Sequence, residues 1–200
     1  HHWRVERDGS LRNGLEYVLS GPIHLADVEP ALTGLFHKLW DSDLVLSDRC
    51  STHVHINCDT AKLNEVVSLF CLWALFEDIV IPWCGTTRTG NHFCTPLSVA
   101  PDPINIMQAA CRDGHINPQQ GGRNLRYTAV NLYAFPKFGS MEFRALRGAE
   151  SPNMVFKWVK YLARLKELST TTFANPRLIA NYMSESSPED FFRLLCEGNE

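Results

Sequence analysis

The stretch "CSTHVHINCD", residues 50–59, places two histidines on either side of a single valine. Side chains alternate between the two faces of a β-strand, so a strand over Thr52–Cys58 would put His53 and His55 on the same face. Asn57 follows on that face. We predict a central strand here, with His55 lining a pocket. Two titratable rings side by side on one face are the first indication of a functional site.

The composition limits what this chain can be. It has 200 residues, of which 44% are hydrophobic, and a formal net charge of -3. These values fit one globular domain over residues 1–200 and give no reason to expect binding to nucleic acid or to an anionic membrane. The longest apolar run, Val66–Trp83, is interrupted by polar residues and a proline, so we predict no membrane span. Seven cysteines without a CxxC pair, and no signal sequence at the start, indicate free thiols and a cytoplasmic protein.

Hydrophobic periodicity on both sides of the histidine strand predicts a mixed α+β chain. Antiparallel pairing is favoured by short hairpins, such as one between Trp3–Arg7 and Leu15–Leu19, and the helices would pack on one face of a curved, mainly antiparallel sheet. The other face would be free for polar side chains. Helices are predicted at Asp27–Trp40, from a cap at Asp59 to about Ile81, at Pro103–Arg112, at Pro152–Leu168 and after a cap at Ser187. Strands are predicted at Trp3–Arg7, Leu15–Leu19, Thr52–Cys58, Tyr127–Ala134 and Ser140–Leu146.

The strand in "SMEFRALRG", residues 140–148, separates charged from apolar residues. Glu142 and Arg144 share one face, and Met141, Phe143 and Ala145 take the other. A Glu–Arg pair on a strand is most often a solvent-facing ion pair of small value. The other polar residues on the predicted strands can also have purely structural roles. Examples are Glu16 in the second strand and Asn131 in the fourth.

The joint occurrence of these groups is more informative than any one of them. Carboxylates, imidazoles and guanidinium groups on one sheet face suit a nucleoside triphosphate with its magnesium ion. Oxygen ligands hold Mg²⁺, and arginine neutralises phosphate through two parallel hydrogen bonds.

Six short motifs then occur in an order that resembles the amidoligase family of the carboxylate–amine ligase superfamily. They are "WRVERDGS", "GLEYVLSGP", "STHVHIN", "RTGNHFCTPL", "RYTAVNL" and "MEFRALRG", and they cover about residues 3 to 165. The resemblance implies a glutamine-synthetase-like fold whose concave sheet face holds ATP and divalent ions. It also implies that a carboxylate and an amine are joined at the expense of ATP through an acyl phosphate.

The resemblance carries the family's site onto particular residues of this chain. It implies catalytic roles for Glu16, His55, Glu142 and Arg144, with magnesium held by Glu16, His55 and Glu142. His53 would be the structural partner of the histidine pair. Cofactor-binding roles are implied for Asp8, Ser10, Arg88, Arg126 and Asn131. The substrates would be a small-molecule or peptide carboxylate and an amine, which the sequence does not identify.

One departure leaves alternatives open. Members of the family usually begin with a Gly-x-Glu-x-Glu strand that supplies metal ligands, and nothing before Trp3 matches it. We therefore expect a domain that lacks this strand, with residues 170–200 as a helical C-terminal extension. A zinc-dependent hydrolase using His53, His55 and Glu142 is one alternative. A catalytically inactive binding or structural module of the same fold is another.

Overall fold

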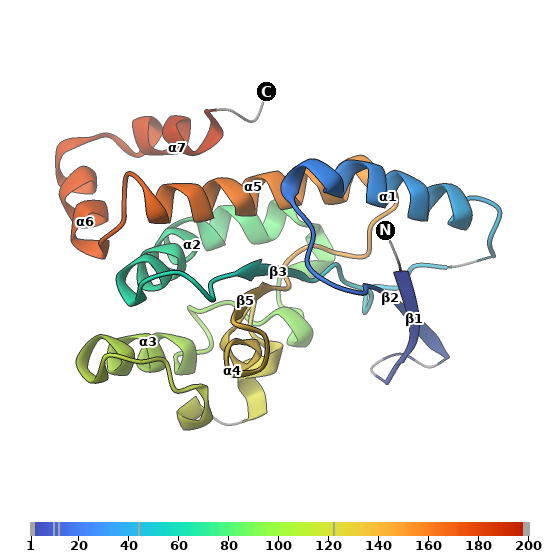
Figure 1. Ribbon diagram of the computed structural model, residues 1–200, viewed down its shortest axis with the longest axis horizontal. Helices are drawn as coiled ribbons and strands as arrows, with labels where there is room; N and C mark the ends of the chain where they lie inside the picture. Colours follow the sequence, from blue (N-terminus) through green and yellow to red (C-terminus); the bar gives the residue numbers. More distant parts are fainter. Residues whose placement is uncertain (1–2, 10, 12, 44, 122, 198–200) are drawn as a thin grey trace.

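Two long helices lie over a short three-stranded sheet at the centre of the computed structural model, which describes residues 3–9, 11, 13–43, 45–121 and 123–197 (Figure 1). The helices are α2 (Leu63–Trp83) and α5 (Pro152–Thr170), which pack against each other. The sheet is antiparallel in the order β3-β5-β4, with β3 at Val54–Asn57, β4 at Val130–Asn131 and β5 at Ser140–Phe143.

The core between these layers is aromatic. The Trp73 ring of α2 meets Phe143 of β5 edge-on at a centroid distance of 5.3 Å and Trp158 of α5 at 5.9 Å. All three side chains are completely buried. The apolar face predicted for residues 140–146 therefore turns toward the helices, and this contact fixes which face of β5 carries its charged residues.

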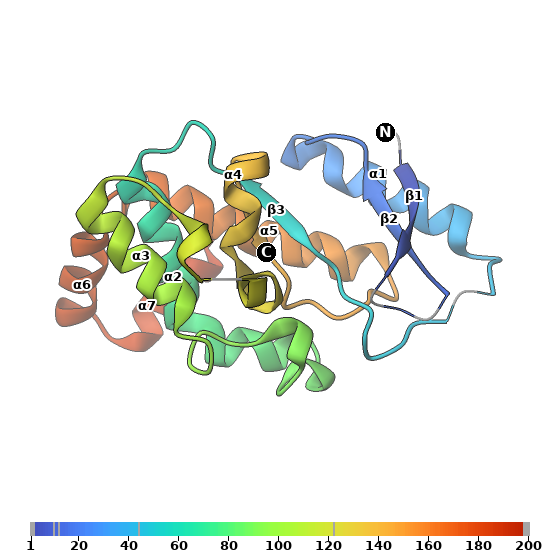
Figure 2. The ribbon, with the colours of Figure 1, turned by 90° about the horizontal axis from the view of Figure 1, so that it is seen from below.

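The two N-terminal strands form a separate hairpin. β1 (Trp3–Asp8) pairs antiparallel with β2 (Gly14–Leu19), as predicted, but neither strand joins the central sheet. Helix α1 (Leu25–Leu39) follows and packs on α5, and the Trp3 indole donates a hydrogen bond to the Ala31 carbonyl at 3.3 Å. Figure 2 shows the hairpin beside α1, at the end of the molecule away from the C-terminal helices. The α+β class is confirmed, whereas the described strands form two small sheets in place of one curved sheet.

The C-terminal region is helical and belongs to the core. It contains α6 (Pro176–Glu185) and α7 (Pro188–Cys196). Phe191 of α7 lies 5.2 Å from the Phe76 ring of α2 and 5.4 Å from Phe173. Residues 170–200 were predicted to be a helical extension, and their described part is indeed helical, but its aromatic side chains close one end of the main core. The remaining helices are α3 (Asp102–Asp113) and the single turn α4 (Phe135–Phe138), joined by short 3₁₀ turns.

The strand predicted at Tyr127–Ala134 is only two residues long. The Thr128 hydroxyl lies within donating distance of the carbonyl oxygens of Leu125 and Val130, at 2.7 and 2.6 Å, and holds a turn before β4. The Asn131 side chain accepts from the Tyr133 amide at 2.8 Å and starts a 3₁₀ turn directly after β4. These local side-chain bonds replace the ladder that simple alternation predicted.

Helix boundaries agree with the sequence where the capping chemistry is unambiguous. Ser187 caps α7 by accepting from the Asp190 amide at 3.1 Å, as predicted. Asp59 does not cap α2, because the helix starts at Leu63 and the Glu65 carboxylate accepts from the Lys62 amide at 2.9 Å. A carboxylate at this third helical position satisfies one of the unpaired amides at a helix start.

Helix α2 is the one described helix that is long and apolar enough to cross a membrane, with a mean hydropathy of 1.8. However, 61% of its apolar window is buried inside the protein, as in the core helix of a soluble protein. All seven cysteines are free thiols in the structure.

Candidate functional site

A row of polar side chains crosses the central sheet. Glu142 on β5 lies directly opposite His55 on β3 and opposite Asn131 on β4. Residues opposite one another in antiparallel strands point to the same face, so the three side chains form one row. The middle strand of the sheet is β5, and β3 lies at its edge, which corrects the prediction of a central histidine strand.

Glu142 is the centre of this row. One of its oxygens, Oε1, accepts from Arg144 Nη1 at 2.6 Å and lies 3.3 Å from His53 Nδ1. The other oxygen accepts from Asn131 Nδ2 at 2.5 Å. The residue is only 6% exposed. The Glu142 carboxylate is therefore buried and contacted by three side chains from three segments of the chain, whereas His55 in the same row is exposed.

Arg88 holds the backbone next to this site. Its side chain is completely buried, and its guanidinium donates to the carbonyls of Ala145 and Arg144 at 2.9 and 2.8 Å. The sequence had suggested that Arg88 binds phosphate. The structure instead uses its charge to fix the backbone after β5, from which the Arg144 side chain extends to Glu142.

The two histidines of "STHVHIN" have different partners. His53 Nε2 lies 2.7 Å from the Ser51 hydroxyl, and His55 Nδ1 lies 2.9 Å from the Ser140 hydroxyl. Burial, followed by the charge of Arg144, lowers the pKa of His53 to about 4. Burial also lowers the pKa of His55, against an opposing effect of the Glu142 charge. Both rings are therefore neutral at neutral pH.

The two serines were not among the residues selected from the sequence. Ser140 precedes Glu142 by two positions, and Ser51 precedes His53 by two positions. Strand alternation places residues two apart on one face, so the same rule that selected the histidines could have selected both serines.

The hairpin contributes carboxylates from a second direction. Glu6 lies opposite Glu16 in the β1–β2 register, so two like charges face each other on one side of the hairpin. The pKa of Glu16 is raised by burial first, and then by the negative charges of Asp8, Glu6 and Glu142. Arg144 acts on it in the opposite sense. The fold therefore brings Glu16 within electrostatic range of Glu142 and Arg144, although the two strands belong to different sheets.

Two other predicted site residues are placed elsewhere or fall outside the described part. Arg126 is exposed, and its guanidinium lies 4.7 Å from the centre of the Tyr127 ring. No described contact joins it to Glu142. Ser10 lies outside the described residues.

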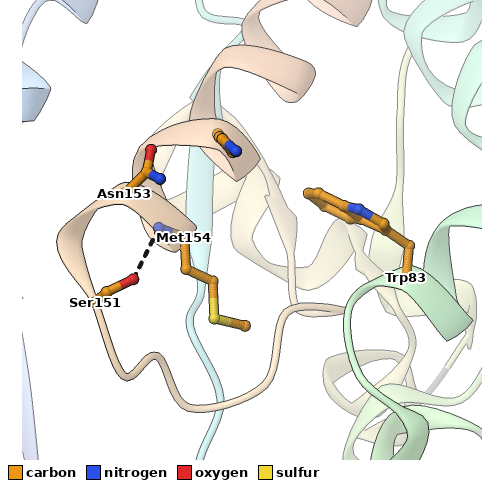
Figure 3. Close-up of a pocket in the computed structure, with 5 residues that line it drawn as sticks. Trp83, Ser151, Asn153 and Met154 are labelled. Atoms are coloured by element: carbon orange, nitrogen blue, oxygen red, sulfur yellow. Dashed lines mark hydrogen bonds between the residues drawn. The ribbon is translucent and has the colours of Figure 1, made fainter.

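Two cavities lie apart from the polar row. One cavity of about 280 Å³ opens between Trp83 at the end of α2 and the start of α5, where Ser151 caps the helix through the Met154 amide at 3.3 Å (Figure 3). A second, of about 310 Å³, is bordered by His92, Tyr127 and Asp102 among others. Neither cavity is bordered by a residue of the polar row or by His53, so the site is identified by its chemistry.

Within the described part of the chain, no group of three or more His, Cys, Asp or Glu side chains is placed to hold a metal ion. A magnesium ion that arrives with a nucleotide needs only one or two protein carboxylates, because phosphate oxygens and water supply its other ligands. Glu142 and Glu16 fit that smaller requirement. A carboxylate offers about four acceptor positions, and the described hydrogen bonds use two of those on Glu142.

Comparisons with known proteins add no family to this description. No protein-family model, curated protein or solved structure matches the chain.

Proposed function

We propose that this protein is an ATP- and magnesium-dependent ligase that joins a carboxylate to an amine, with a glutamine-synthetase-like arrangement of its site. One observation carries the proposal: the buried Glu142 carboxylate pairs with Arg144 at 2.6 Å, and the charges of both groups act on the pKa of Glu16 in the separate N-terminal hairpin. Two negative charges close together are unfavourable unless a cation compensates them. Together with an arginine, they are the groups that a magnesium nucleotide requires.

The proposed reaction requires the protein to position the substrates and to neutralise phosphate charge. The substrate carboxylate attacks the γ-phosphorus of ATP, the bond to the β,γ-bridging oxygen breaks, and ADP leaves. The amine then attacks the carbonyl carbon of the acyl phosphate, loses a proton and displaces inorganic phosphate. Magnesium, when bound with the nucleotide, would neutralise phosphate charge.

The residues divide these tasks. Glu142 and Glu16 would hold the magnesium ion, and His55 would offer its Nε2 atom to a phosphate oxygen because Nδ1 faces Ser140. Arg144 would neutralise a phosphate or the substrate carboxylate. Asn131 would keep Glu142 oriented, as its hydrogen bond does in the free protein. A zinc hydrolase is less favoured, because catalytic zinc takes three protein ligands and the described residues assemble no such set.

The test is binding of Mg·ATP, measured by thermal shift and by isothermal titration calorimetry. Wild-type protein should be stabilised, by about 2.7 kcal/mol when the free ligand is about 100 times its Kd. Glu16→Gln keeps the shape of the side chain and removes its charge, so it should lose most of this stabilisation without unfolding the protein. Glu150→Gln is the matched control, because Glu150 is an exposed glutamate paired with Arg147.

Two further variants address the centre of the site. Glu142→Gln should also abolish Mg·ATP binding, but it leaves Arg144 without its carboxylate and should destabilise the free protein by about 3 kcal/mol or more. Arg144→Lys keeps the charge and loses the two-pronged geometry, so binding should weaken by about 1 to 3 kcal/mol. If wild-type protein shows no response to Mg·ATP, the ligase proposal fails and an inactive module of the same arrangement becomes the better description.

A further inference from the structure

The cavity of about 310 Å³ is bordered by residues from the start of α3 and from the segment before β4. Its volume is at the lower end of the range for small-molecule sites, roughly 300 to 1,000 Å³. Asp102 at the start of α3, Tyr127 and Thr95 are among the residues that border it. None of its bordering residues has a role in the proposed ligase reaction.

The charge at this cavity is negative. Among the described residues that border it, Asp102 is the one carboxylate, and none is a lysine or an arginine. Asp102 is partly buried, and its carboxylate forms no hydrogen bond or ion pair within the described part of the chain. The carboxylate is therefore available to a ligand that enters the cavity.

The start of α3 does not cancel this charge. A helix start carries about half of a positive elementary charge, which is less than the charge of one carboxylate. Pro101 and Pro103 on either side of Asp102 also lack the N–H groups with which most helix starts bind anions. The border of the cavity therefore favours a cation over an anion.

An aromatic side chain forms a second part of the border. The Tyr127 ring is held by the ring of His92 at a centroid distance of 5.3 Å and by the ring of Phe93 at 5.6 Å. The guanidinium of Arg126, which does not border the cavity, lies 4.7 Å from the centre of the same ring. This contact shows that the Tyr127 ring accepts a positive charge. Much of the remaining border is apolar and includes Val99.

We propose that this cavity binds a primary organic ammonium ion with an apolar body. The Asp102 carboxylate accepts hydrogen bonds from the ammonium group, and the Tyr127 ring and Val99 contact the body of the ligand. A carboxylate for the charged end and an aromatic, apolar wall for the rest match the two halves of such a molecule.

The cavity is connected to the sheet of the polar row by backbone hydrogen bonds. The Arg144 amide donates to the Ala129 carbonyl at 2.9 Å, and the Ala129 amide donates to the Thr95 carbonyl at 2.8 Å. Neighbouring strands lie about 4.8 Å apart, so the backbone of Thr95 is about 10 Å from that of Arg144. Any role of the bound cation as the amine substrate rests on the proposed function, whereas its binding does not.

Binding can be measured on the whole chain by ¹H–¹⁵N NMR titration at low ionic strength. Phenethylammonium should shift the backbone amide signals of Thr95, Val99 and Tyr127 and reach saturation at millimolar concentrations. The probe 3-phenylpropionate has a similar body and the opposite charge, so it should give no saturable shift. Equal affinity for both probes, or no saturable shift with phenethylammonium, would overturn the proposal.

Variants test the assigned carboxylate. Asp102→Asn should weaken binding of phenethylammonium by about 10-fold or more, the value of a hydrogen bond between charged groups, and Asp102→Glu should retain most of the affinity. Asp113→Asn is the matched control, because Asp113 is an exposed aspartate of the same helix that does not border the cavity. Wild-type affinity in Asp102→Asn, or an equal loss in Asp113→Asn, would contradict the role of Asp102.

Arg126→Ala tests the sign of the charge without altering the cavity border. Removing a like charge should strengthen binding of phenethylammonium, by up to about 5-fold. Weaker binding in this variant would show that the site prefers an anionic group.

The failure of this proposal can be distinguished from that of the proposed function. If wild-type protein binds phenethylammonium but not Mg·ATP, the cation site stands and the ligase proposal fails. If Mg·ATP binds and phenethylammonium does not, the ligase proposal stands without this site.

Discussion

Arg88 and Arg126 had the same predicted role, but the structure predicts very different costs for removing them. Arg88 is completely buried and donates to two backbone carbonyls, at 2.9 and 2.8 Å. Each hydrogen bond from a charged group contributes about 1.5 to 3 kcal/mol, so Arg88→Ala forfeits about 3 to 6 kcal/mol. Releasing a buried guanidinium from its desolvation cost offsets part of this. We expect a net loss of about 3 to 5 kcal/mol.

Arg126 is the matched control. It is exposed and contacts the Tyr127 ring, which at an exposed site is worth about 0.5 to 1 kcal/mol. Urea unfolding of Arg126→Ala should therefore give nearly the wild-type free energy. Because a loss of about 5 kcal/mol can unfold a small protein, Arg88→Lys provides a milder variant that keeps one carbonyl contact and should lose about 1.5 to 3 kcal/mol.

One result of this comparison would contradict the structural role of Arg88. If Arg88→Ala and Arg126→Ala lower the free energy of unfolding by amounts within about 0.5 kcal/mol of each other, at unchanged m-values, Arg88 is not a structural residue. An Arg88→Lys variant with wild-type stability and impaired Mg·ATP binding would restore the phosphate-binding role suggested by the sequence.

Two further predictions concern the buried Glu77. Burial raises its pKa above the usual 4.5, so its contribution to the free energy of unfolding is fully present below about pH 4.5 and is lost as pH rises through the raised pKa. Glu77→Gln should remove that pH dependence when unfolding is followed from about pH 4 to about pH 8, and a variant with the wild-type pH profile would contradict the assignment. Trp73 Nε1 donates to Glu77 at 2.8 Å, whereas the equally buried Trp158 Nε1 has no hydrogen-bond partner among the described residues. Trp73→Phe should therefore cost about 1.5 to 3 kcal/mol more than Trp158→Phe in urea unfolding, and equal costs would refute this difference.

The sequence predicted those features that depend on local periodicity. The apolar face of residues 140–146, the pairing of the N-terminal hairpin and the long helices were all expected, because burial of one face fixes the register of a strand or helix. The same rule put Glu142 and Arg144 on one face, where the structure joins them at 2.6 Å. Such predictions need only the spacing of neighbours along the chain.

Other features depend on contacts that spacing does not encode. The strand at Tyr127–Ala134 was shortened by side-chain bonds from Thr128 and Asn131, each of which offers the backbone an alternative to pairing. Arg88 was selected because its charge suits phosphate. Its partners are carbonyls more than 50 residues away in the sequence, and no local pattern reports them.

The position of Glu16 shows most clearly what the sequence leaves open. Strand alternation assigns its face within the hairpin, but not what that face meets. The hairpin lies beside α1, to which Trp3 is bonded through the Ala31 carbonyl, and α1 packs on α5, which also covers the central sheet. The strands that carry Glu16 and Glu142 are thus connected through α1 and α5. A change in the α1–α5 contact would separate the two carboxylates while leaving every motif intact. The proposed site therefore depends on how the two sheets pack against the same helices. The motifs supply its residues but do not determine this packing.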